Sequence, residues 1–150
     1  MARKITVNIV VFLCILLLVY AAVSKLLDYE KFTVQLGQSP MLTKYAETFV
    51  WFVPLVELII SALLIIPKAR IIGLYAAFSL MTMFTTYIIL ASRFNDFVPC
   101  SCGGVIQNMS WEQHLLFNAA FLFLILIGIL LCIRDEDINV QPYQTLGSAL

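Results

Sequence analysis

Long apolar runs with almost no charges dominate the pattern of this chain. They lie at residues 5–24, 49–66, 71–91 and 115–133, and only the second contains an ionisable residue, Glu57. A hydrocarbon core roughly 30 Å thick is crossed by a helix of about 20 residues. Because lipid offers the backbone no hydrogen-bond partners, each run must be helical. The pattern therefore predicts an all-α membrane protein, an antiparallel bundle of four transmembrane helices.

The polar segments between the runs predict how the helices connect. Residues 67–70 make so short a turn that the second and third spans must form an antiparallel hairpin. Residues 25–48 and 92–114 are too short to form cores of their own, so they lie on one membrane face of the bundle. The first of these segments has apolar residues at helical spacing: Leu26, Leu27, Phe32 and Leu36. This spacing predicts a short amphipathic helix in the interface between the first two spans.

Basic residues at the ends of the runs indicate the orientation. Arg3 and Lys4 precede the first run, and Lys68 and Arg70 fill the short turn. The two long segments carry fewer basic residues for their length, and cytoplasmic loops are rich in Lys and Arg. We therefore expect both termini in the cytoplasm and both long segments outside, with residues 135–150 forming a polar, loosely ordered cytoplasmic tail.

A cleaved signal peptide is the alternative for the N-terminus. Arg3 and Lys4 resemble the charged start of such a peptide, and Ala21-Ala22-Val23-Ser24 resembles its cleavage site. The apolar run exceeds the usual 7–15 residues, which favours retention as a span. Cleavage would leave three spans and move one terminus to the other side.

Composition narrows the class of partner. The chain of 150 residues is 62% apolar and 12% charged, against roughly 45–50% and 25% in soluble domains. Nine basic residues balance nine acidic ones, so the net charge is zero. Without a basic surface, binding to nucleic acid is excluded. The apolar composition instead predicts that the protein's surroundings, and so its first interaction partner, are the lipids of the bilayer.

The candidate chemistry begins at Cys100 and Cys102, in the long segment expected outside. A disulfide between them would close so small a ring that it would stabilise the fold by only roughly 1.5 kcal/mol before strain. Strained, exposed disulfides are labile, so the pair is better suited to exchanging electrons than to holding structure. The pair therefore predicts a redox-active disulfide.

Other readings of the four cysteines stay open. Cys100 and Cys102 could be inert thiols or a static bridge. A zinc site would need further ligands such as His114, and the spacing matches no common zinc pattern, so no metal is predicted. Cys14 and Cys132 lie in apolar runs at depths that differ by roughly 12 Å, and we expect both to be small apolar core residues.

Glu57 is the one ionisable side chain within the runs. Counting about 1.5 Å per residue puts it level with Cys14, near the membrane midplane. With no Lys or Arg inside any run, we expect a protonated carboxyl hydrogen-bonded within the bundle. Such a group could pass a proton to a quinone-like acceptor. Equally, it could fix helix packing through one of three hydroxyl groups, those of Ser61, Ser79 and Thr82.

His114 and Asn118 are one helical turn apart and share a face of the fourth span, just beneath the cysteine segment. His114 could act as the general acid or base that sets the thiolate fraction of Cys100 or Cys102. The plainer alternative is a histidine solvated in the membrane interface.

Several short motifs make the chain resemble the MauE/DoxX-like membrane proteins over residues 5–133. The motifs are Lys25-x-x-Asp28-x-x-x-Phe32, Pro54-x-x-Glu57, Cys100-x-Cys102-x-Gly104, and Trp111 with Asn118. The resemblance implies a bundle like that of vitamin K epoxide reductase, in the bacterial inner membrane, with a role in thiol redox processes. For MauE this role is linked to maturation of the disulfide-rich methylamine dehydrogenase light subunit.

The chain also departs from that family pattern. Ser101 and Gly103 replace the Gly and Phe of Cys-Gly-Cys-Phe-Gly, and Phe117 replaces an Arg. A specific methylamine role therefore does not follow from the motifs. Enzymes similar to vitamin K epoxide reductase use two cysteine pairs, whereas this chain has one pair, so electrons must pass directly between it and a membrane carrier or partner protein.

The leading hypothesis is a thiol–disulfide redox protein, a candidate oxidoreductase. Cys100 and Cys102 would exchange a disulfide with an extracytoplasmic protein, His114 would tune their thiolates, and Glu57 would handle protons or a quinone. The rival is a scaffold subunit of a larger membrane complex, in which the cysteine segment docks other subunits. A transporter is a weaker third reading, because the short spans show no broken helices.

Overall fold

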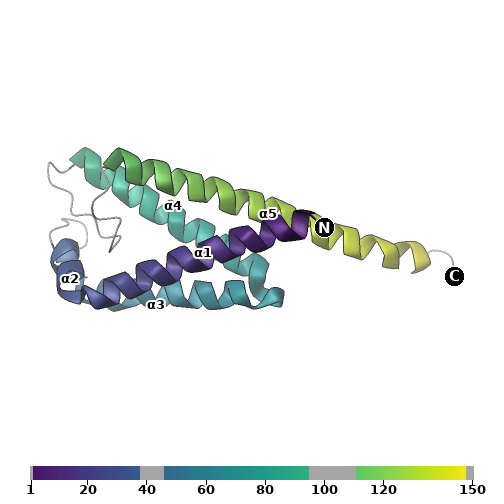
Figure 1. Ribbon diagram of the computed structural model, residues 1–150, viewed down its shortest axis with the longest axis horizontal. Helices are drawn as coiled ribbons and strands as arrows, with labels where there is room; N and C mark the ends of the chain where they lie inside the picture. The colour runs from purple at the N-terminus through teal and green to yellow at the C-terminus, as the bar shows by residue number, and fades with distance from the viewer. Residues whose placement is uncertain (1, 38–45, 95–110, 148–150) are drawn as a thin grey trace.

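Four long helices packed side by side make up most of the computed structural model, which describes residues 2–37, 46–94 and 111–147 (Figure 1). The helices are α1 (Ala2–Leu27), α3 (Ala46–Ile65), α4 (Arg70–Phe94) and α5 (Trp111–Gly147). Each contains an apolar stretch long enough to cross a bilayer. The predicted four-span all-α bundle is confirmed, and this is a multi-pass membrane protein.

A short helix, α2 (Tyr29–Gly37), follows α1 at one end of the bundle. We call this the α2 end; α1 and α4 finish there, and α3 and α5 begin there (Figure 1). Phe32 and Leu36 of α2 are buried against Val50 of α3. The predicted helix between the first two spans is therefore confirmed.

Two of the residues assigned to that interfacial helix belong elsewhere. Leu26 and Leu27 complete the last turn of α1, and their side chains are exposed. The backbone hydrogen bonds run on through Asp28, whose amide donates to Ser24. The first membrane helix is therefore longer than its uncharged run, and this carries Lys25 into the bundle.

The opposite end of the bundle holds the hairpin turn between α3 and α4. A short 3₁₀ helix, η2 (Pro67–Ala69), makes this turn. Arg70, which begins α4, donates through Nη1 to Asn8 Oδ1 of α1 at 3.0 Å. The tight turn joins α3 to α4, and this bond holds α4 against α1, at the end of the bundle where the chain starts (Figure 1).

The main core lies between the four long helices. Its buried members include Val10, Cys14, Leu64, Leu74 and Ile125. Cys14 is 2% exposed, as predicted for a core residue, and Cys132 is half-buried against the same cluster. Both are free thiols. Large apolar side chains elsewhere point outward, as a lipid-facing surface requires; among them are Phe12, Leu16, Trp51, Met83, Leu116 and Phe123.

Two glycines allow the helices to approach closely. A Cβ on Gly73 would lie 3.0 Å from the backbone nitrogen of Leu64, and one on Gly128 would lie 3.0 Å from Cγ1 of Val10. Small residues at such contacts let membrane helices gain dispersion energy where lipid removes the usual hydrophobic driving force. Gly73 therefore sets the spacing of α3 and α4, and Gly128 that of α1 and α5.

The last helix continues far past its membrane span. α5 has 37 residues, which corresponds to about 56 Å, and its final part projects from the bundle beside the N-terminus (Figure 1). The backbone of residues 135–147 is thus described as helical, and the cytoplasmic tail expected for residues 135–150 stays a prediction. Each residue added to an existing helix forms one further backbone hydrogen bond. Because the membrane span is already helical, the residues after it can continue the helix without the free-energy cost of nucleating a new one.

Replacing Gly73 with Val should destabilise the bundle by about 1–3 kcal/mol, because the added methyl groups meet the α3 backbone, which cannot rotate away. Reversible unfolding in mixed detergent micelles would measure the change. Ala119→Val, at an exposed position of α5, is the control and should stay within about 0.5 kcal/mol. Equal effects of the two substitutions would contradict the assigned helix contact.

Candidate functional site

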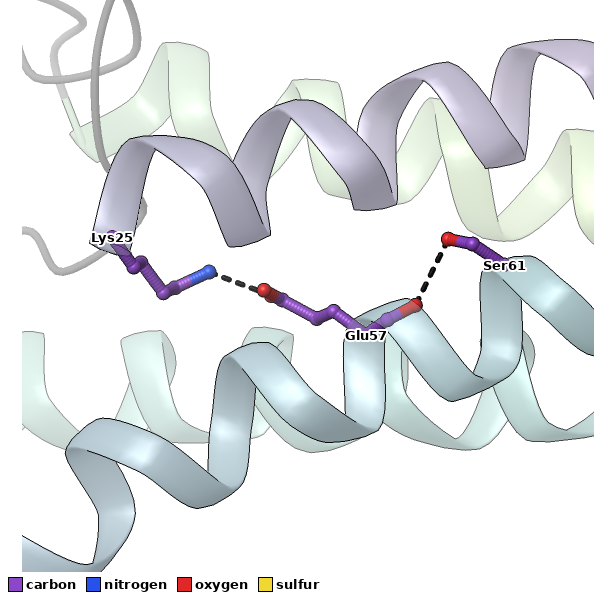
Figure 2. Close-up of polar contacts among 3 residues, drawn as sticks. All are labelled: Lys25, Glu57 and Ser61. Atoms are coloured by element: carbon purple, nitrogen blue, oxygen red, sulfur yellow. Dashed lines mark hydrogen bonds and ion pairs between the residues drawn. The ribbon is translucent and has the colours of Figure 1, made fainter. Parts of the chain in front are cut away.

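A buried ion pair joins α1 to α3. Lys25 Nζ lies 2.6 Å from Glu57 Oε1, and the two side chains are 4% and 0% exposed (Figure 2). The prediction that Glu57 lacks a counter-charge is therefore wrong. Lys25 was assigned to a polar segment outside the membrane, whereas it belongs to the last turns of α1 and extends its side chain into the bundle.

The fold-back of α2 explains how Lys25 becomes buried. Nζ of Lys25 lies 6.0 Å from the ring centre of Phe32 in α2 and 5.5 Å from that of Phe84 in α4. Aromatic faces at this range attract an ammonium group, and the apolar stem of a lysine packs well among such side chains. Three helices other than its own thus surround the charge: α2, α3 and α4.

The carboxylate of Glu57 does not hydrogen-bond the hydroxyl groups of Ser61 or Thr82, which the sequence suggested as partners. Ser61 Oγ donates to the backbone carbonyl of Glu57 at 2.9 Å (Figure 2), so this contact is local to α3. Ser79 is exposed, and Thr82 donates to the backbone carbonyl of Phe78. The expected packing role through these three hydroxyls is wrong, because the carboxylate contacts Lys25 instead.

The depth assigned to Glu57 also changes. It lines a small cavity together with Leu18 and Ala21 of α1, which lie one to two turns nearer the α2 end than Cys14. Counting from the ends of the runs placed it too far from that end, because the turn between α3 and α4 lies level with Asn8 of α1, to which Arg70 donates, and not with the start of the first run.

His114 and Asn118 line the same cavity from α5. They are 1% and 4% exposed, so the predicted shared face is confirmed and the alternative of a solvated histidine is wrong. The cavity has a volume of about 30 Å³ and is lined by the following residues: Leu17, Leu18, Ala21, Lys25, Glu57, Met81, Phe84, His114, Phe117 and Asn118. Four polar side chains from α1, α3 and α5 therefore line one cavity inside the bundle.

Cys100 and Cys102 lie outside the described residues, so the proposed contact of His114 with their thiolates stays a prediction. They belong to the connection from Phe94, at the end of α4, to Trp111, at the start of α5. This connection attaches to the α2 end of the bundle, and His114 lies in the first turn of α5. Within the described ranges, no three His, Cys, Asp or Glu side chains form a group that could hold a metal ion.

Sequence reasoning missed Lys25 as a site residue, although signals for it were present. Lys25 and Phe32 both stand in one motif shared with the resembling family, and Glu57 stands in another. A lysine stem is also long enough to carry a charge several ångströms away from its own helix. Nothing local identified Phe84, whose role depends entirely on how α4 packs.

Comparison with known proteins supports the resemblance. A family model described as methylamine utilisation protein MauE matches residues 3–131. The matched range includes Lys25, Glu57, His114 and both cysteines of the α4–α5 connection. No curated protein and no solved structure matches the chain.

Removing one partner of the ion pair should cost far more than removing both. Lys25→Met or Glu57→Gln alone leaves a buried charge without its partner and should destabilise the protein by about 3–5 kcal/mol. The double variant, which removes both charges, should lose clearly less stability than either single variant, as a double-mutant cycle in detergent unfolding would measure.

Lys31→Met provides the matched control, since Lys31 lies in α2 but is exposed. It should change the free energy of unfolding by less than about 0.5 kcal/mol. If Lys25→Met behaved like this control, or if the two losses simply added, the pair would not stabilise the fold.

Proposed function

The chain belongs to the family of methylamine utilisation protein MauE, and we propose that it is a membrane-bound thiol–disulfide exchange protein whose reactive pair is Cys100 and Cys102. One observation carries the proposal. The segment with both cysteines connects α4 to α5 at the bundle end where His114 and the Lys25–Glu57 pair are buried. The chain therefore connects a closely spaced thiol pair to the end of the bundle that holds these ionisable groups.

The proposed reaction is exchange through a mixed disulfide. A thiolate of one cysteine attacks a disulfide of an extracytoplasmic partner protein, forming one S–S bond and releasing one partner thiolate. The second cysteine then attacks the mixed bond, closing the Cys100–Cys102 disulfide and releasing the other partner thiolate. Two electrons pass to the partner, whose sulfurs take up the two protons lost by the cysteines. In the reverse direction, the same steps oxidise the partner.

His114 and Lys25 support this chemistry in the proposal. Thiolates are favoured beside basic groups, and these two lie at the end of the bundle that bears the cysteine segment. His114 would exchange the thiol proton. Lys25 is held at that end by Glu57, which therefore acts as a positioning residue.

A quinone is not required for the exchange, because electrons pass directly between sulfur atoms. The cavity beside Glu57 has a volume of about 30 Å³, whereas a cavity that holds a benzene ring measures roughly 150 Å³.

We further propose that the protein lies in a bacterial inner membrane with both termini in the cytoplasm. In this orientation, the cysteine segment faces the periplasm, where disulfides persist. Two observations support it: Arg70 bonds to Asn8 of α1, and exposed Lys68 lies in the same turn. Basic residues thus collect at the end of the bundle opposite the α2 end, as expected for a cytoplasmic face.

Trapping and titration of the cysteine pair test the exchange. In a Cys14→Ala/Cys132→Ala background, the pair should pass between dithiol and disulfide in glutathione buffers, with a potential above roughly −300 mV. Adding Cys100→Ser or Cys102→Ser should allow one of the two variants to accumulate a mixed disulfide with a periplasmic protein, seen by acid quenching and alkylation. The doubly substituted serine variant is the control and should trap nothing.

A pair that stays wholly reduced or wholly oxidised in every buffer would contradict the exchange. Full function of both single serine variants, together with copurification in fixed ratio with other membrane subunits, would instead support the scaffold reading.

Labelling in intact cells tests the orientation. A membrane-impermeant maleimide should modify Cys102 as the sole cysteine, and should modify a Lys68→Cys variant of the cysteine-free chain only after lysis. Because both variants are labelled in lysed cells if folded, lysis supplies the control for accessibility. The reverse pattern would place the cysteine segment in the cytoplasm and end the proposal of periplasmic exchange.

A further inference from the structure

Basic side chains gather at the bundle end opposite the α2 end. Arg70, which begins α4, donates to Oδ1 of Asn8 in α1 at 3.0 Å. Lys4 lies one helical turn before Asn8 and therefore on the same face of α1. Lys68 belongs to the turn η2, directly before α4, and both lysines are exposed while Arg70 is half-buried. We call Lys4, Lys68 and Arg70 the basic edge.

The described residues leave the charges of the basic edge without a carboxylate. The side chain of Asn8, which Arg70 contacts, is neutral, and no ion pair among the described residues includes a member of the basic edge. The carboxylates whose side chains the structure describes lie at or near the other end of the bundle: Asp28, Glu30, Glu47, Glu57 and Glu112. Because a cation at the edge of hydrocarbon is costly without a counter-charge, the basic edge should attract an anion from outside these residues.

Exposed apolar side chains flank the basic edge and favour one kind of anion. Ile66 lies directly before the turn, Ile72 lies in the first turn of α4, and Ile9 follows Asn8; all three are at least half exposed. A free phosphate ion would use only the cations. A phospholipid carries its phosphate directly above two acyl chains, so it can also cover the apolar side chains next to the cations.

We propose that the basic edge binds the headgroup of an anionic phospholipid. The two exposed lysines contact the phosphate, because their long stems carry the charge beyond their own helical segments. Arg70 adds its charge from beneath them and is held in place by Asn8. The acyl chains lie against Ile66 and Ile72. One lipid molecule then connects α1 to the turn between α3 and α4.

The acidic run 135–137 is the competing source of negative charge in the chain. It follows Arg134 in α5, which passes the N-terminus as it leaves the bundle (Figure 1). The sequence places five basic residues at this end of the bundle: Arg3, Lys4, Lys68, Arg70 and Arg134. Three carboxylates would neutralise at most three of these five, so at least two positive charges remain for a lipid.

Lipid retention by the folded full chain in detergent micelles tests the site, and native mass spectrometry would measure it. Each basic residue beside an anionic headgroup is worth roughly fivefold in affinity, so the chain should bind phosphatidylglycerol roughly a hundredfold more tightly than phosphatidylcholine with the same acyl chains. An equal concentration of inorganic phosphate should not displace the lipid. Equal affinity for the two lipids, or displacement by phosphate, would overturn the proposal, and neither comparison needs a variant.

Substitution of the lysines gives a second readout. Lys4→Gln/Lys68→Gln should weaken phosphatidylglycerol binding by about 25-fold and leave phosphatidylcholine binding unchanged. Lys31→Gln/Lys44→Gln is the matched control, since it removes two charges from the segment between α1 and α3, and it should change neither affinity by more than about twofold. Equal losses in the two variants would show attraction to the overall charge and overturn the site.

Neutralising the acidic run separates the lipid from the chain's own carboxylates. Phosphatidylglycerol should bind while the run is intact. If it bound only to the variant Asp135→Asn/Glu136→Gln/Asp137→Asn, the acidic run would occupy the basic edge and the proposal would be overturned. None of these measurements involves Cys100 or Cys102, so the lipid site stands or fails independently of the thiol–disulfide exchange.

Discussion

The structure depends on a constraint that the membrane imposes on two charges. A lysine or a carboxylate alone in hydrocarbon is costly, and a buried pair is stable only while both partners remain. Lys25 and Glu57 are 2.6 Å apart and almost fully buried, so the end of α1 must stay against the middle of α3. The rings of Phe32 and Phe84 then lie about the ammonium group, which ties α2 and α4 to the same point.

Close packing provides the second constraint, nearer the opposite end of the bundle. Lipid tails are as apolar as leucine, so burial alone does not hold membrane helices together. Gly73 and Gly128 let neighbouring helices approach until a Cβ would touch the partner. Close helix contacts at Gly73 and Gly128 thus fix the bundle in one part, and the Lys25–Glu57 ion pair fixes it in another. Together, the two kinds of contact determine how the four helices cross.

The α2 end of the bundle differs from the opposite end in the polar side chains that it buries. A lysine, a carboxylate, a histidine and an asparagine from three helices line the cavity there, whereas residues such as Val10, Leu64 and Ile125 form an apolar cluster between the helices. The connection with Cys100 and Cys102 attaches to this end in a chain that belongs to the MauE family. The exchange proposed for these cysteines would therefore take place at the polar end of the bundle.

The sequence alone determined most of the features that depend on local pattern, although the end of α1 and the length of α5 were not among them. Apolar runs of about 20 residues specify four spans whatever their packing. The spacing of Phe32 and Leu36 specifies α2, and the one-turn separation of His114 and Asn118 specifies a shared face. Lys25 and Glu57 stand in two separate motifs of the resembling family, but only Glu57 was singled out as a site residue. Only the tertiary structure decided that Lys25 and Glu57 form a pair, because they are 32 positions apart in the chain. They meet because the helices cross and α2 folds back onto the bundle. The periodicity of a single helix encodes neither the crossing nor the fold-back.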